Sequence, residues 1–290
     1  MAIWKDQTLV KPRPEEIPVP YDYRNELKKV KEYYGGDPLQ KRFSAVVSGE
    51  TNSGKTFLFR TARFPVHIDS FDPGGTKCLE EWIKKGDIVA DTSYETEDPF
   101  KPTAYAKWKK DTELRFMIGY YDQFATYCLD SLSTFSDAVM NDVLNSSDRA
   151  GKVPQHRKDY NPQKVAIVNY IRKLMNLSCD FILTAHLRED RRLVHLDTST
   201  GIKREEIKYR LKMTGQAVIT IPLLFDELYV LLGRGMPPKR ELITDSLGEY
   251  VARSRLKKGG LLDTKEEPDI KKLLKKAKIP WEDKPKLEVE

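Results

Sequence analysis

One stretch of the chain decides the fold, namely Gly49-Glu50-Thr51-Asn52-Ser53-Gly54-Lys55-Thr56. It has the form GxxxxGKT, it follows an apolar run, and a helix-forming stretch comes after it. A phosphate-binding loop requires that order, because backbone amides and a helix N-terminus surround the phosphates while Lys55 reaches the terminal ones and Thr56 binds magnesium. Together with Phe57, the stretch is therefore predicted to bind ATP with Mg²⁺. The alternative is a glycine-rich turn that fits the pattern by chance.

The composition favours a soluble protein with much polar surface. Of the 290 residues, 39% are hydrophobic and 32% are charged. No apolar run approaches the roughly 20 residues that span a bilayer, and Met1–Asp6 lacks the pattern of a secretory signal. We therefore expect a cytoplasmic protein without a membrane partner. Cys78, Cys128 and Cys179 have no metal-ligand spacing, so neither a zinc site nor a disulfide framework is expected.

The sequence predicts three parts. Residues 1–40 form an arm, because the prolines at 12, 14, 18 and 20 prevent a long helix. Residues 41–256 form a core domain in which short apolar runs alternate with helical stretches. That alternation predicts an α/β fold with a mostly parallel sheet flanked by helices and with antiparallel strands towards the C-terminal side. Residues 257–290 form a lysine-rich tail with one short helix.

Short β-branched or aromatic runs indicate the strands of the core, and helical spacing indicates the helices between them. The predicted parallel strands are Phe43–Val47, Val66–Ser70, Ile88–Ala90, Phe124–Leu129 and Phe181–Ala185. The predicted helices are Lys55–Arg63, Pro102–Met117, Asp137–Leu144 and Val165–Leu177. A hairpin is expected from Leu193–Leu196 and Ile207–Leu211, followed by the strands Leu228–Leu232, Glu241–Thr244 and Tyr250–Ala252.

A second part of the site is predicted where another apolar strand ends in a carboxylate, in Tyr127-Cys128-Leu129-Asp130-Ser131. An unpaired charge at the end of a buried strand is unfavourable, so a bound cation accounts for Asp130 better than packing does. We therefore predict that Asp130 and Thr56 hold the magnesium ion. The alternative is that Asp130 caps the following helix, since Asp is a favoured N-cap residue.

Together these segments resemble the RecA-type ATPase core, through the phosphate loop, Asp130-Ser131-Leu132 and the strand ending in Thr184-Ala185-His186. The resemblance covers about residues 42–256. Within that superfamily the chain most resembles the compact phage-encoded ATPases of single-strand annealing and recombination, also through Ala252-Arg253-Ser254-Arg255-Leu256. This resemblance implies ATP hydrolysis and a homo-oligomeric ring or filament. It further implies single-stranded DNA and a single-strand-binding protein as partners, in the cytoplasm of a bacterial host.

The resemblance also implies a carboxylate that activates the attacking water. In RecA-like enzymes it follows the second strand, where Val66-His67-Ile68-Asp69-Ser70-Phe71-Asp72 offers Asp69 and Asp72. We assign the role to Asp72, although the family usually has Glu there. Glu50, inside the phosphate loop, is a rival base because it lies close to the phosphates. The plainer alternative for Asp72 is a turn former before Pro73.

Three further residues receive roles from the same resemblance. His186 takes the place of the polar residue that senses the γ-phosphate, and its alternative is a half-buried histidine at a strand end. Arg253 and Arg255 stand at alternate positions of a predicted strand, so both point to one face. They fit two cations that complete the site of a neighbouring copy. The alternative is a solvated strand face.

Two loops line the path of single-stranded DNA in the resembling family, and both corresponding segments here are basic. Cations with an interleaved aromatic, as at Tyr160, are typical of sequence-tolerant strand binding. The residues predicted to contact DNA are Arg149, Lys152, Arg157, Lys158, Arg188, Arg191 and Arg192. The lysines of the tail either add affinity or lie on an amphipathic helix that docks through Leu273 and Leu274.

Three functions follow from these patterns. The first is a DNA-stimulated ATPase that assembles on single-stranded DNA. The second is a DNA-packaging or helicase-loading motor, or a phosphotransferase, since the phosphate loop is common to all of these enzymes. The third is a nucleotide-gated interaction scaffold with little hydrolysis, which the missing Glu favours.

Overall fold

The computed structural model describes residues 23–36, 42–156, 158–195, 203–213, 217–234, 239–256 and 260–287. Contacts divide the chain into two units, Met1–Gln40 and Lys41–Glu290. The described part of the first unit is helix α1 (Tyr23–Gly36), which has no buried residue. Its apolar side chains, which include Leu27 and Val30, are therefore free of packing within the described part of that unit.

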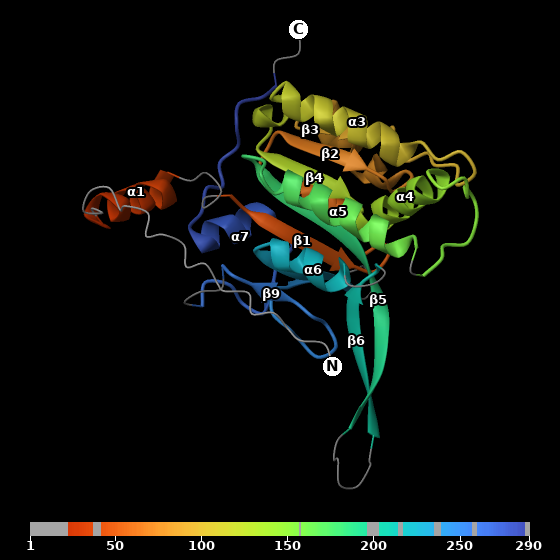
Figure 1. Cartoon of the computed structure of the whole chain (residues 1–290). Helices are drawn as coiled ribbons and strands as arrows, with labels where there is room; N and C mark the ends of the chain where they lie inside the picture. Colours follow the sequence, from red (N-terminus) through yellow and green to blue (C-terminus); the bar gives the residue numbers. More distant parts are fainter. Residues whose placement is uncertain are drawn as a thin grey trace, which may run out of the picture. The chain divides into compact units, whose positions relative to one another are not determined.

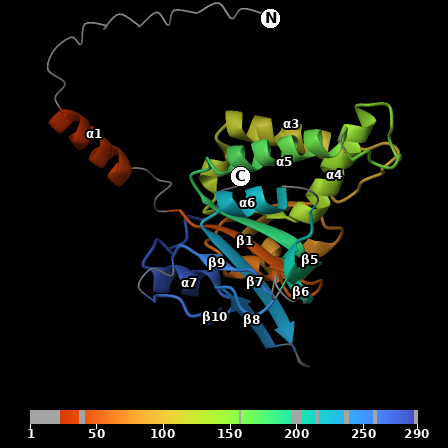
Figure 2. The same ribbon diagram turned by 60° about the horizontal axis from the view of Figure 1, so that its bottom comes forward.

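The second unit is built on one mixed sheet (Figures 1 and 2). Its parallel strands lie in the order β7-β1-β5-β4-β2-β3. Their bounds are β1 (Ser44–Gly49), β2 (Val66–Ser70), β3 (Ile88–Asp91), β4 (Thr126–Asp130), β5 (Asp180–His195) and β7 (Glu227–Arg234). The antiparallel strands are β6 (Lys203–Leu211), β8 (Lys239–Ile243), β9 (Arg253–Ser254) and β10 (Lys265–Glu266). The predicted fold class is therefore confirmed.

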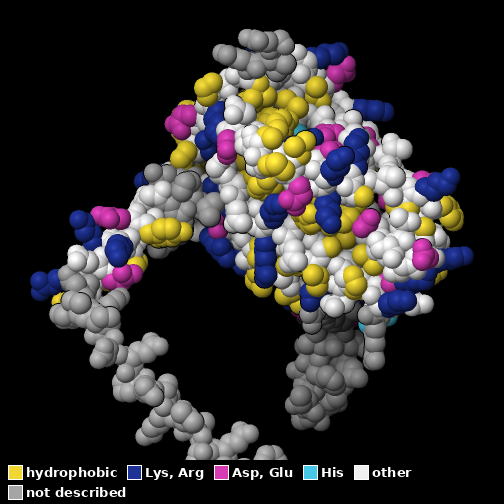
Figure 3. All heavy atoms as spheres, turned by 45° about the horizontal axis from the view of Figure 1, so that its top comes forward, with side chains coloured by type: hydrophobic (Ala, Val, Ile, Leu, Met, Phe, Trp, Pro, Cys, Tyr) yellow, Lys and Arg dark blue, Asp and Glu magenta, His cyan; other side chains and the backbone are white. Residues whose placement is uncertain are grey.

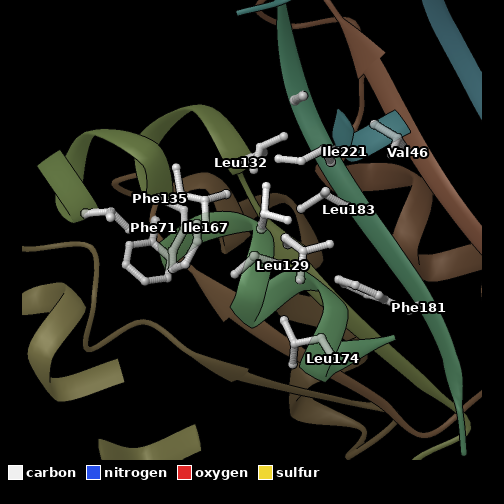
Figure 4. Packing of buried hydrophobic residues seen from close by; sticks show 14 of the residues in the cluster. Val46, Phe71, Leu129, Leu132, Phe135, Ile167, Leu174, Phe181, Leu183 and Ile221 are labelled. Atoms are coloured by element: carbon white, nitrogen blue, oxygen red, sulfur yellow. The ribbon is translucent and has the colours of Figure 1, made fainter. Parts of the chain in front are cut away.

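Helices cover both faces of the sheet, because successive side chains of each strand point to opposite faces. The helices on one face are α3 (Ala104–Met117), α4 (Leu132–Asn145), α5 (Tyr160–Leu174), α6 (Ala217–Leu224) and the 3₁₀ helix η4 (Tyr120–Gln123). Figure 4 shows how Leu129 and Leu183 of the strands meet Phe135, Ile167 and Ile221 of these helices. Each such buried side chain stabilises the fold by about 1.5–3 kcal/mol.

The opposite face is covered by shorter elements. They are the 3₁₀ helices η2 (Thr56–Thr61) and η3 (Gly75–Leu79), with α2 (Glu80–Lys84) and α7 (Ile270–Ala277). Ile270, Leu273 and Leu274 of α7 are buried against this core, which also contains Leu58 and Phe59 of η2. The helix of the lysine-rich tail therefore docks on the sheet, as the second of the two alternatives predicts.

The predicted hairpin is longer than expected. Strand β5 continues past the sheet and pairs with β6 from Leu187↔Leu211 to His195↔Lys203, forming a two-stranded ribbon (Figure 1). Ion pairs across the strands support the ribbon, such as that from Arg210 Nε to Asp190 Oδ2 at 2.9 Å. The prediction that the basic segment from Arg188 onwards is a loop was therefore wrong, because cross-strand pairs continue through it.

Several other elements differ from the prediction. The helix expected at Lys55–Arg63 is the 3₁₀ helix η2, because Pro65 and the start of β2 leave room for only a short helix. Helix α4 begins earlier than expected, at Leu132, because Ser131 and Thr134 form a capping box. Tyr250–Ala252 is not a strand, since Tyr250 makes only isolated bridges to Leu247 and Tyr209 among the described residues.

No helix in the described part of the chain is long and apolar enough to cross a membrane. On the side that α3 presents, hydrophobic side chains lie among lysines, arginines and acidic residues (Figure 3).

Candidate nucleotide-binding site

Four parallel strands bring the predicted site residues to one edge of the sheet. The phosphate loop begins at Gly49, where β1 ends, and Asp130 is the last residue of β4. Asp72 follows the end of β2, and His186 lies opposite Gly49 in the pairing of β5 with β1. Because the carboxyl ends of parallel strands meet at the same edge, the topology collects these side chains from distant parts of the sequence.

The backbone of the phosphate loop depends on its glycines. Gly54 has a φ of 99°, a conformation that residues other than glycine rarely adopt. A Cβ atom on Gly49 would lie 2.4 Å from Ser53 Oγ and 2.7 Å from the Leu231 carbonyl oxygen. The loop therefore requires Gly49 because of its close approach to β7, and Gly54 because of its backbone conformation.

Lys55 folds back on the loop. Its ammonium group donates to the carbonyl oxygens of Gly49 at 3.1 Å and Glu50 at 2.8 Å, and the residue is 6% exposed. Burial lowers the pKa of Lys55, although the nearby carboxylates of Asp130 and Asp72 act in the opposite direction. An ammonium group held beside two carboxylates at a phosphate loop is suited to bind phosphate oxygens.

Asp130 lies at the centre of the site and is fully buried. The Thr56 hydroxyl donates to its Oδ2 at 2.7 Å, and the Thr184 hydroxyl donates to its Oδ1. Burial raises the pKa of Asp130 to about 6, and the charge of Asp72 adds to this effect. The alternative role as a helix cap is excluded, because the N-cap residue of α4 is Ser131.

Gly75 lies beside the oxygen atoms of Asp130 and Thr56. A Cβ atom on Gly75 would lie 3.6 Å from Asp130 Oδ2 and 3.9 Å from Thr56 Oγ1, which is ordinary van der Waals contact. Among the described residues, no cluster of three or more His, Cys, Asp or Glu side chains could hold a metal ion. Mg²⁺ in nucleotide sites is bound by one or two protein oxygens together with phosphate oxygens and water, and this donor set fits that pattern.

The Asp72 carboxylate is held in place by three side chains. Its Oδ1 accepts hydrogen bonds from Ser131 Oγ at 3.0 Å and Thr134 Oγ1 at 2.6 Å, and its Oδ2 lies 3.5 Å from His186 Nε2. Burial alone would raise the pKa of Asp72, but the hydrogen bonds from His186, Thr134 and Ser131 hold it below its ordinary value. The prediction did not include Ser131 and Thr134, although both follow Asp130 closely in the sequence.

The other two candidate bases differ sharply. Asp69 is fully buried and accepts hydrogen bonds from Trp108 at 2.8 Å and Tyr127 at 2.7 Å, while Arg115 pairs with it at 2.8 Å. Asp69 is therefore a structural residue, buried too deeply to contact a water molecule beside a bound phosphate. Glu50 is exposed in the phosphate loop and stays a rival to Asp72.

Glu95 is a residue that the sequence did not indicate. Its carboxylate accepts hydrogen bonds from the Ser70 hydroxyl at 2.7 Å and from the Gly74 backbone amide at 2.8 Å. It thereby fixes both ends of the turn that carries Asp72. No motif surrounds Glu95, so only the folded chain reveals this role.

His186 connects the site to its surroundings. Its side chain is 25% exposed and faces Asp72, and its backbone amide donates to Ser133 Oγ at 3.1 Å. Its carbonyl oxygen accepts from the backbone amide of Lys212 at 2.7 Å. His186 therefore contacts the segment after β2, helix α4 and the segment that follows the ribbon.

Arg253 and Arg255 lie away from these residues. Arg253 lies in β9, which pairs with the amino end of β7 at the edge of the sheet opposite the phosphate loop, and Arg255 follows that strand. Arg253 donates to the carbonyl oxygens of Pro222 and Phe225, both at 2.9 Å, and Arg255 pairs with Asp226 at 2.9 Å. Their described contacts thus tie the end of α6 to β9 within one chain. Completion of a neighbour's site stays a prediction.

The residues predicted to contact DNA fall into two groups. In the first, Arg149 pairs with Asp159, whereas Lys152 and Lys158 are exposed. Arg157 lies outside the described residues. In the second, all members belong to β5; Arg188 and Arg191 are exposed, and the side chain of Arg192 lies outside the described part of the chain.

No protein-family model matches the chain, and no curated protein matches it in sequence. Solved structures do match. A KaiC-like protein from Pyrococcus horikoshii OT3 has 12% identity and a TM-score of 0.36, with 71% of this chain and 80% of that chain covered. The flagellar accessory protein FlaH from Methanocaldococcus jannaschii has 15% identity and a TM-score of 0.35, with 71% and 83% covered. An ATPase from the type III secretion system of pathogenic bacteria has 12% identity and a TM-score of 0.35, with 66% and 52% covered.

Proposed function

We propose that the chain binds ATP with Mg²⁺ at the edge formed by β1, β4, β2 and β5, and hydrolyses it. One observation carries the proposal: the hydrogen bond of 2.7 Å between the phosphate-loop residue Thr56 and Asp130, which lies at the end of another strand. A phosphate loop alone binds anions, whereas a carboxylate joined to its threonine adds the position of the metal ion. Mg²⁺ held by Thr56 and Asp130 would neutralise the charge of the phosphates.

The residues then have separate tasks. Backbone amides of the loop hold the phosphates, and Lys55 exchanges its carbonyl partners for phosphate oxygens. Thr56 and Asp130 hold the metal ion. Asp72 orients the attacking water. His186, 3.5 Å from Asp72, donates a hydrogen bond to the γ-phosphate and loses that bond when the phosphate leaves after cleavage. Loss of that phosphate would be transmitted through Lys212 to the ribbon.

The first test concerns the base. Replacing Asp72 with Asn should lower the rate of ATP turnover by about 10²–10³-fold, because a general base contributes about that much. The affinity for Mg·ATP should change only a few-fold, since Asp72 does not contact the phosphates in this proposal. Phosphate release and calorimetric binding measure the two effects. Glu50→Gln is the matched control, and turnover that is lost in Glu50→Gln but kept in Asp72→Asn would transfer the role to Glu50.

A second candidate function is a nucleotide-gated scaffold with slow hydrolysis. The observation that favours it is the engagement of Asp72 by Ser131, Thr134 and His186, with a lowered pKa, because a well-satisfied carboxylate is a weak base. Turnover of the unmodified protein below about one event per hour would favour the scaffold, far below the usual range of enzymes.

We further propose single-stranded DNA as the partner and the ribbon as its contact, with oligomers forming on the DNA. In the ribbon Arg188 lies opposite Arg210, and Lys208 lies opposite Asp190. Arg188 also lines a cavity of about 400 Å³ together with Lys212 and the aromatic Tyr160. Two cations beside an aromatic ring in one cavity favour a nucleic-acid backbone with unpaired bases.

The double variant Arg188→Ala/Lys208→Ala tests this contact. Its affinity for single-stranded DNA should fall by about tenfold or more, and the slope of log K against log salt should decrease by about 1.4, because each lost phosphate contact contributes about 0.7. Fluorescence anisotropy at several salt concentrations measures both. Lys271→Ala/Lys275→Ala in α7 is the charge-matched control. An unchanged slope in the ribbon variant would remove the ribbon from the DNA path.

A further inference from the structure

A cavity of about 280 Å³ lies beside the phosphate loop. Its lining includes Gly54 of the loop, Phe57 and Arg60 of η2, Arg240 of β8 and Pro268 before α7. These residues come from three distant parts of the sequence, and the resemblance that indicates the phosphate loop gives no role to Arg60 or Arg240.

The walls of this cavity are an aromatic ring and two guanidinium groups. Arg60 Cζ lies 4.3 Å and Arg240 Cζ 5.6 Å from the centre of the Phe57 ring. Trp82 supports the same ring from its edge, with ring centres 5.9 Å apart. A guanidinium group over an aromatic face is a flat, polarisable surface on which other planar groups stack.

Arg240 is also joined to the phosphate loop itself. Its Nε donates to the Ser53 carbonyl oxygen at 3.2 Å. It passes so close that a Cβ atom on Gly54 would lie 2.6 Å from this Nε. A group that stacks on Phe57 and Arg240 is therefore adjacent to any phosphates held by the loop.

Apart from the two guanidinium groups, which lie against the Phe57 ring, the cavity offers little to read the edge of a base. Leu58, Leu231 and Pro268 contribute apolar surface. The Thr61 hydroxyl is already engaged, since it donates to the Leu58 carbonyl oxygen at 2.7 Å and accepts from the Ile270 amide at 3.0 Å. Glu267 is exposed and paired with Lys272 at 2.6 Å. Stacking, rather than a hydrogen-bond pattern, is the interaction that this lining supplies.

We infer that this cavity receives the base and ribose of the bound nucleotide, with Phe57 as the stacking platform and Arg240 as the residue that holds the base against the loop. The inference rests on the proposed nucleotide binding and adds the position and selectivity of the base. Because the base is held by stacking, purine nucleotides should bind alike, with ATP and GTP within about tenfold of one another.

Calorimetry with three Mg²⁺-bound ligands tests the inference: ATP, GTP and inorganic tripolyphosphate, which has no base. Phe57→Leu keeps an apolar side chain but removes the ring, and it should weaken ATP and GTP by about tenfold or more, because stacking on an aromatic ring holds a base whatever its edge pattern. Tripolyphosphate should bind within about twofold of its original affinity. Arg240→Ala should give the same pattern, and Phe57→Trp should restore ATP binding. Phe100→Ala, at an exposed phenylalanine, is the control.

The outcomes separate the two proposals. Equal losses for ATP and tripolyphosphate in Phe57→Leu would mean that the ring supports the loop rather than a base, and would overturn the inference while nucleotide binding stands. A preference of more than about 100-fold between ATP and GTP would overturn binding by stacking alone. An unmodified protein that binds none of the three ligands would overturn both proposals.

Discussion

Replacing Lys55 with alanine should reduce the affinity for Mg·ATP by about 10²–10³-fold, because each hydrogen bond from a charged group contributes about 1.5–3 kcal/mol and the ammonium group is expected to bridge two phosphates. Lys55 is 6% exposed and donates to two loop carbonyls. The variant should therefore fold normally, since removal of a buried ammonium also removes the cost of its burial, which already lowers the pKa of Lys55.

Thermal unfolding with and without ligand measures this effect. The unmodified protein should gain about 2.7 kcal/mol at an ATP concentration of about one hundred times its Kd, and Lys55→Ala should gain at most about 0.4 kcal/mol at the same concentration. Lys84→Ala, on an exposed helix, is the matched control and should keep the whole gain. If Lys55→Ala kept the gain, the bound phosphates would not lie on this loop.

The sequence predicts the sheet because local signals and topology agree there. The apolar strands are short and buried on both faces. Glycine is required at positions 49 and 54 by the local backbone, through a close approach at Gly49 and a positive φ at Gly54. Asp130 could be predicted for the same reason, since a carboxylate that ends a buried strand requires a partner.

Other parts of the site depend on long-range contacts that no local pattern contains. Glu95 accepts hydrogen bonds from Ser70 and Gly74, and Arg240 contacts Ser53 and the Phe57 ring. Likewise, the alternation of Arg253 and Arg255 predicts a shared face, and both side chains do bind the end of α6. The alternation does not indicate that partner, because α6 is distant in the sequence.

The ribbon illustrates the opposite error. Its charged residues favour a loop on composition, but residues of opposite charge pair across the two strands and so stabilise each other. Composition alone does not reveal this strand, because its ion pairs form only after the hairpin closes.

Asp130→Asn should have two opposite effects, which arise from one buried charge. The pKa of Asp130 is raised to about 6 from an ordinary 3.8, first by burial and then by Asp72, while Thr184, Thr56 and Lys55 act against the rise. A folded pKa above the unfolded one means that ionisation opposes folding, so stability from this group is fully present below about pH 4 and is lost as the pH rises through about 6. At neutral pH the cost is about 3 kcal/mol.

A neutral amide of the same shape removes that cost but gives up a metal ligand. With a chelator present, Asp130→Asn should therefore be more stable than the unmodified protein by about 1–3 kcal/mol at about pH 7, and the difference should vanish near about pH 4. With Mg·ATP present, the variant should lose most of the ligand's stabilisation and about 10²-fold or more of turnover, because the metal ion loses its protein carboxylate. Denaturant unfolding at both pH values and phosphate release measure these effects.

Asp180 provides the matched control, since burial also raises its pKa to about 6 but its partner is Arg63, at 3.2 Å. It begins β5, at the edge of the sheet opposite the phosphate loop. Asp180→Asn removes a comparable cost of a buried charge, so it should also stabilise the fold at about pH 7, but its response to Mg·ATP should persist. Loss of that response at Asp130 alone would show that Asp130 holds the cation. A destabilised Asp130→Asn, with its response to Mg²⁺ intact, would instead make Asp130 a structural residue.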